Sequence, residues 1–234
     1  MKSHRMHRTQ RTQRTQRGLS LVELLVGVAI ALFIAAAGAT LLAGSLRENR
    51  ALLLEARLMQ DLRAAADIVT RDLRRAGHWG AATDGVWSVG ASGVAVNPYV
   101  AMAPTAAASD AVSFRYSRDA TENNNVDSNE QFGFRLRSGA IEIQLGAANW
   151  QALTDVGTLV VTEFGVTPGV QTIDLGSFCA TPCPPASATC PPHQQVRSLA
   201  LVISGRLVAD ATVTRSVRSE LRLRNDVLVG ACAG

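Results

Sequence analysis

A single carboxylate within an apolar stretch is the first feature of this chain that suggests chemistry. Glu23 lies in the segment GLSLVELLVGVAI, with apolar residues on both sides. A carboxylate at a membrane is costly to bury, so it marks a functional site unless it lies at the headgroup level and is simply solvated. Glu23 alone does not decide between these interpretations.

Four cysteines form a second candidate site late in the chain. Cys179, Cys183 and Cys190 lie in or near the proline-rich stretch ATPCPPASATCPP, and Cys232 lies near the C-terminus. An even number of cysteines in such a segment predicts two disulfides and an oxidising compartment. Three pairings are possible, and we favour Cys183–Cys190 with Cys179–Cys232. Zinc, with His193 as an extra ligand, is the alternative, but the C-x3-C-x6-C spacing lacks the C-x2-C pairs of zinc sites.

Residues 119–130, DATENNNVDSNE, have the oxygen spacing of a calcium loop. Asp119, Asn123, Asp127 and Glu130 fall at positions 1, 5, 9 and 12 of the twelve, as in an EF-hand. Position 6 is Asn124 instead of glycine, and the flanking sequence is typical of strands. We therefore expect a solvated polar connection and keep calcium as the weaker hypothesis.

Groups for catalysis are few. Outside the first 18 residues there are only two histidines, His78 and His193, and there is no Gly-x-Ser-x-Gly elbow, phosphate loop or histidine-rich metal motif. We expect His78 to be a packed residue at a helix end. The sequence therefore predicts no enzyme, no cofactor and no metal.

Positive charge is concentrated in the first 18 residues. Six of the 23 basic residues lie there and no acidic residue does, so residues 19–234 carry 17 basic against 19 acidic residues, a net charge of −2. The arginine, threonine and glutamine repeat RTQRTQRTQR has no apolar content and should be disordered. Nucleic-acid binding by the remainder therefore loses its main support.

The 23 residues from Leu24 to Leu46 contain no charge and no proline. As a helix they would extend about 35 Å, enough to cross a membrane. Six basic residues precede the span, and Arg47 and Arg50 follow it. This asymmetry predicts a cytoplasmic N-terminus and an exported remainder. A secretory signal cleaved after Ala36 or Ala43 is the alternative.

The order of basic residues, Arg17-Gly18, Leu19-Ser20-Leu21-Val22-Glu23 and a long apolar helix resembles the class III signal of type IV prepilins. The resemblance implies that prepilin peptidase cuts between Gly18 and Leu19 and methylates Leu19. It also implies that Glu23 is the acid used in assembly. Leu19, Ser20, Leu21 and Val22 stand where the commonest family pattern has Phe, Thr, Leu and Ile.

The stretch DLRRAGHWG, Asp72 to Gly80, resembles the helix-end signature of PilW-type minor pilins. It implies a minor subunit of a type IV pilus that helps to start filament assembly at or near the tip. The expected partners are prepilin peptidase, other minor and major pilins and the inner membrane, within a hetero-oligomeric filament and without nucleic acid. The expected location is the inner membrane, single-pass with a periplasmic head, and then the pilus. A minor pseudopilin of type II secretion and an adhesive tip pilin are the alternatives.

The periodicity beyond the span predicts an α+β fold. An apolar stripe recurs at helical spacing and should pack on the chain's own sheet: Leu58, Leu62, Ala66, Val69, Leu73 and Ala76. Gly77 should end a helix that covers roughly residues 20–76.

Alternating apolar residues predict strands near 112–116, 132–136, 141–145, 158–164, 198–204 and 215–224, the last with a charged outer face. The predicted parts are a basic leader (1–18), a membrane or filament-core helix (19–46), an amphipathic helix with its end (47–80) and a β-rich head (81–234).

Overall fold

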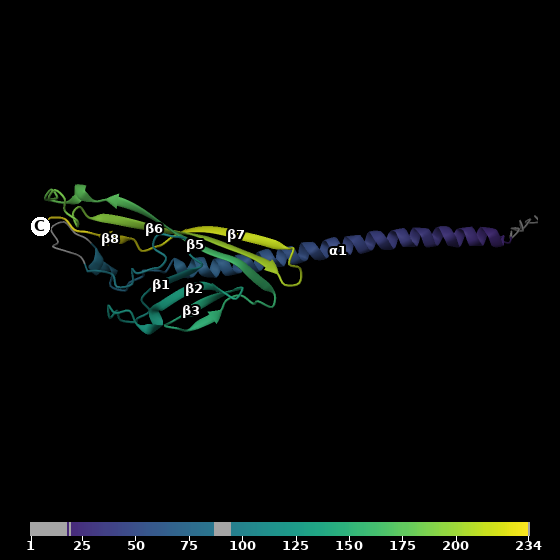
Figure 1. The fold of residues 1–234 in the computed structure, drawn as a ribbon, viewed down its shortest axis with the longest axis horizontal. Helices are drawn as coiled ribbons and strands as arrows, with labels where there is room; N and C mark the ends of the chain where they lie inside the picture. The colour runs from purple at the N-terminus through teal and green to yellow at the C-terminus, as the bar shows by residue number, and fades with distance from the viewer. Residues whose placement is uncertain (1–17, 19, 87–94, 234) are drawn as a thin grey trace, which may run out of the picture. The chain divides into compact units, whose positions relative to one another are not determined.

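The computed structural model describes residues 18, 20–86 and 95–233. The chain divides into two compact units, Met1–Ala51 and Leu52–Gly234. The described elements, labelled as in Figure 1, are α1 (Leu21–Leu73), η1 (Ala82–Gly85), β1 (Ala111–Arg115), η2 (Ser128–Glu130), β2 (Gln131–Arg137), β3 (Ala140–Leu145), β4 (Trp150–Ala152), β5 (Leu159–Asp174), η3 (Gly176–Phe178), β6 (His193–Leu207), β7 (Thr214–Arg222) and β8 (Val227–Val229).

Helix α1 carries the predicted apolar stripe as far as Leu73, and Ala76 lies in the turns that follow. All six stripe residues are buried, and Ala65 extends the stripe. After Leu73 the chain continues in turns, with the Ala76 N–H donating to the Leu73 carbonyl at 3.0 Å. Gly77 follows with a φ of 73°, a conformation that glycine adopts without strain. The helix thus ends within a few residues of Gly77, as the sequence predicted.

The first sheet has the antiparallel order β1-β2-β3-β4. β2 and β3 form the predicted hairpin, whose turn residues Ser138 and Gly139 both have positive φ. Aromatic side chains stack along the buried face of this sheet. Tyr116 and Phe132 are the closest pair, with ring centroids 3.9 Å apart. Such stacking adds to the free energy gained by burying the rings.

The second sheet has the order β5-β6-β7, and β8 pairs with β6 beyond the end of β7. β5 and β6 form a long antiparallel ribbon that extends well past the predicted strands 158–164 and 198–204. In the outer half of β5, Pro168 pairs with Leu199. A proline is tolerated there because, among the described strands, β6 alone pairs with this half of β5, so the missing N–H can face the open side.

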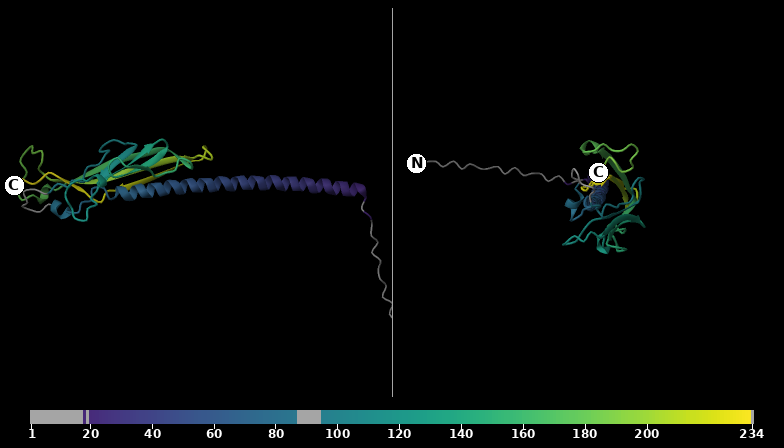
Figure 2. Two further views of the ribbon diagram at one scale, coloured as in Figure 1. Left: turned by 90° about the horizontal axis from the view of Figure 1, so that it is seen from below. Right: turned by 90° about the vertical axis from the view of Figure 1, so that its left-hand side faces the viewer.

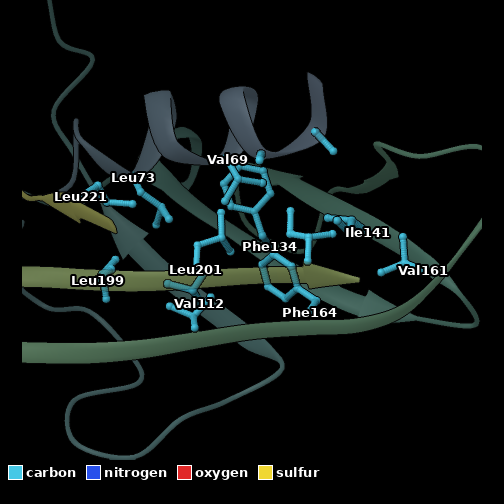
Figure 3. Close-up of a cluster of buried hydrophobic side chains, with 14 of the residues drawn as sticks. Val69, Leu73, Val112, Phe134, Ile141, Val161, Phe164, Leu199, Leu201 and Leu221 are labelled. Atoms are coloured by element: carbon cyan, nitrogen blue, oxygen red, sulfur yellow. The ribbon is translucent and has the colours of Figure 1, made fainter. Parts of the chain in front are cut away.

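The core lies where the second half of α1 meets both sheets (Figures 1 and 2). Val69 and Leu73 point from the helix toward Phe134 of β2 and Leu201 of β6 (Figure 3). All four side chains are buried in one hydrophobic cluster. A helix packed on antiparallel sheets confirms the predicted α+β, pilin-like fold.

Candidate functional site

Glu23 lies in the first turn of α1. The helix begins at Leu21, and the Leu24 N–H donates to the Ser20 carbonyl at 3.1 Å. A carboxylate at this position is favoured by the partial positive charge of a helix N-terminus. The Glu23 side chain is exposed, so within this chain it is free to meet another molecule.

The apolar surface around Glu23 is not covered by the chain itself. Every described residue from Ser20 to Leu53 is exposed, and Leu21, Phe33 and Leu41 are each about three-quarters exposed. Among the described residues, one helix, α1, is both long enough and apolar enough to cross a membrane. So large an apolar surface requires lipid or other helices around it.

The predicted cleavage site is only partly described. Gly18 is exposed, and nothing lies within 4 Å of the position that a Cβ would take. The leader residues 1–17 and Leu19 lie outside the described residues. Cleavage between Gly18 and Leu19, and methylation of Leu19, therefore stay predictions.

The cysteines form two disulfides, Cys179–Cys232 and Cys183–Cys190. This is the pairing that the sequence favoured. The sulfur atoms of Cys179, Cys183 and Cys190 lie within 4.8 Å of one another, which is close enough for a shared metal ion. All three are oxidised in disulfides, however, and the thiolate is the form that binds zinc.

The oxygens of the calcium candidate are engaged with the loop itself. The buried Glu130 carboxylate accepts the Arg118 N–H at 2.7 Å and the Asp127 N–H at 2.9 Å. Asp119 accepts the Asn123 N–H at 3.3 Å. Among the described residues, these acidic groups do not form a cluster that could hold a metal ion. These hydrogen bonds are those of a polar connection, and calcium binding stays the weaker, untested hypothesis.

Two known families match the chain, one near its N-terminus and the other over most of the remainder. The prokaryotic N-terminal methylation motif matches residues 13–39, and the family described as prepilin peptidase-dependent protein B matches residues 51–223. The chain belongs to this family. It is a prepilin-like protein processed by prepilin peptidase, and its apolar helix after the motif indicates membrane anchoring. No curated protein and no solved structure matches the chain.

Within the family match, the segment Asp72 to Gly80 joins the helix end to the rest of the head. Trp79 Nε1 donates to Asn124 Oδ1 at 2.7 Å, and the Gly80 N–H donates to Glu122 at 2.9 Å. The prediction for His78 is wrong, because its side chain is exposed. Its backbone carbonyl makes the structural contact by accepting the Ser117 N–H at 2.9 Å.

Glu122 is the residue of this junction that sequence reasoning missed. Its carboxylate also accepts the Tyr99 hydroxyl at 2.9 Å and the Asn124 N–H at 2.8 Å. Burial raises the pKa of Glu122, but the hydrogen bonds from Ser117, Asn124, Gly80 and Tyr99 outweigh it and leave this pKa below its ordinary value. Burial and the bond to Glu122 raise the pKa of Tyr99. The only sign of Glu122 in the sequence was its acidic side chain, which lies between residues that have the spacing of a calcium loop.

Proposed function

We propose that this prepilin-like protein is a minor pilin that helps to start the assembly of a type IV pilus at or near its tip. The methylation motif over residues 13–39 and the family match over residues 51–223 support a pilin. The resemblance of the segment Asp72 to Gly80 to the helix-end signature of PilW-type minor pilins supports a PilW-type subunit.

The charge distribution supports the route to the membrane. Six basic residues precede the apolar span, so the N-terminus stays in the cytoplasm and the head is periplasmic. The cut falls after Gly18, and the new amino group is that of Leu19. Two disulfides in the head fit an oxidising periplasm.

The single observation that carries the proposal is the exposed carboxylate of Glu23 in a surface of uncovered apolar side chains. Cleavage creates an ammonium group at Leu19, which stays cationic after methylation. In a filament core of low polarity an unpaired charge is costly, so the Glu23 carboxylate pairs with the Leu19 ammonium of a neighbouring subunit. Because Glu23 lies four residues after Leu19, this pairing shifts one helix along the other by four residues, or about 6 Å.

The first prediction is that Glu23→Gln is cut normally but enters filaments at least about tenfold less than the native chain. Glutamine keeps the size of the side chain and removes its charge, so the neighbour's ammonium loses its partner. The measurement is the amount of the chain in sheared filaments relative to the membrane pool, with the N-terminus read by mass spectrometry.

Glu48→Gln is the matched control, because Glu48 is exposed on the same helix beyond the apolar span. It should enter filaments at the native level. A correctly cut Glu23→Gln chain that enters filaments as well as the native protein would contradict the proposed pairing of Glu23 with the Leu19 ammonium.

A further inference from the structure

An arginine-lined groove runs between the C-terminal part of α1 and β7. The cavity has a volume of about 530 Å³, and four arginines line it: Arg71, Arg74, Arg75 and Arg224. We call these residues the arginine groove. Asp67 is the one acidic residue among its lining residues. A second hollow beside Arg74 and Arg224 extends the groove to Arg222.

The arginines of the groove form few ion pairs with acidic groups of the head. In the described part of the chain, Arg71 has one ion pair, a long one of 3.8 Å to Asp72, and Arg74, Arg75 and Arg224 have none. The Arg75 guanidinium lies 4.2 Å from the centre of the Tyr116 ring, which holds it in place by a cation–π contact. Since residues 19–234 are net negative, this cluster is a local feature.

The groove lies along an open sheet edge. β7 pairs with β6 on one side, and on its other side the described residues provide no strand partner. An unpaired edge presents backbone N–H and C=O groups that can accept another strand. Ser219 of β7 lines the groove itself, so the edge strand borders the space that the arginines line.

We propose that the edge of β7 binds an extended acidic segment of another protein. The backbone of that segment adds a strand to the sheet, and its carboxylates pair with the arginine groove. Because side chains alternate along a strand, acids at every second position would all face the helix side. A nucleic acid or a lipid headgroup could neutralise the arginines but has no peptide groups to pair with β7. The proposal does not depend on Glu23 or on the filament role.

The test uses the full chain in detergent and a fluorescent nine-residue peptide of alternating threonine and glutamate. The second prediction is that this peptide binds, and that its analogue with alternate backbone amides methylated binds at least about tenfold more weakly. Both peptides carry the same charge, so the difference measures strand pairing on an unaltered protein. Absence of binding, or equal binding of the two peptides, would overturn the proposal.

Charge reversal tests the arginines. Arg74→Glu combined with Arg224→Glu should weaken peptide binding at least about tenfold, and Arg137→Glu, an exposed arginine of β2 outside the groove, should leave it within about twofold. An equal loss of peptide binding in the double variant and in Arg137→Glu would contradict the arginine groove as the binding site. Tighter binding of a single-stranded DNA of equal charge, or of anionic vesicles, would overturn the choice of a peptide.

Discussion

Gly77 shows how one residue ends the long helix and begins the head. Its φ of 73° lies in the left-handed region, and its N–H donates to the Arg115 carbonyl at 2.8 Å. A Cβ added there would lie 3.1 Å from Arg197 Nη2. That arginine is buried and holds Val100 and Asn225 by their carbonyls, so it has little freedom to move. Backbone strain and crowding therefore act at the same position.

The third prediction is that Gly77→Ala lowers the stability of the head by about 1–2 kcal/mol. An L-residue is strained at this φ, and its methyl group crowds Arg197. The measurement is the thermal unfolding midpoint, which should fall by several degrees. Gly165→Ala is the control, because a Cβ there meets only Val202 at 3.9 Å and φ is not positive. An unchanged midpoint for Gly77→Ala would contradict the argument.

At the scale of elements, the connection between β1 and β2 fastens the helix end. Glu122, in that connection, gathers the Gly80 and Asn124 N–H groups and the Tyr99 hydroxyl around one carboxylate. Hydrogen bonds to an ionised group are stronger than neutral ones. The loop that has calcium-like spacing thus serves in the structure as a docking segment for the end of α1.

The fourth prediction concerns Glu122→Gln, which should destabilise the head by about 1–3 kcal/mol at neutral pH. Because the folded protein lowers the pKa of Glu122, its ionised form adds stability above the ordinary glutamate pKa of about 4.3. That contribution is lost as the pH falls through the lower, folded-state pKa. The difference between native and variant midpoints should therefore shrink in acid.

Glu220→Gln is the control for this pH series, since Glu220 is exposed on β7 and accepts no side-chain hydrogen bond among the described residues. It should give a small difference at every pH. A Glu122→Gln difference that persists unchanged into acid would show that the carboxylate's charge is not the source of the stability.

Sequence periodicity predicted some elements well and missed others for physical reasons. The stripe from Leu58 to Ala76 and the β2–β3 hairpin each rest on local patterns, and the structure contains both. The outer half of β5 was missed because Gly165, Pro168 and Gly169 are typical of turns, whereas pairing with β6 holds them extended. The arginine groove was missed because it joins α1 to Arg224, which is distant in the sequence.

For the whole molecule, the leader reverses the sign of the net charge. The intact chain has a formal charge of +4 and an isoelectric point near 9.2. Residues 19–234 have 17 basic and 19 acidic residues, so their net charge is −2. Basic charge before the span favours a cytoplasmic N-terminus. With the proposed cut after Gly18, the orientation signal would lie in the segment that processing removes.

The fifth prediction is that the mature chain focuses below pH 7, whereas the chain from cells without prepilin peptidase focuses near pH 9. Cutting after Gly18 removes six basic residues and no acid, and methylation of the new amine leaves its positive charge in place. Isoelectric focusing measures the shift, and intact mass fixes the cut, since a later cut would also give an acidic product. A native chain that stays basic, or a mass that places the cut beyond Glu23, would contradict both the leader and the assembly acid.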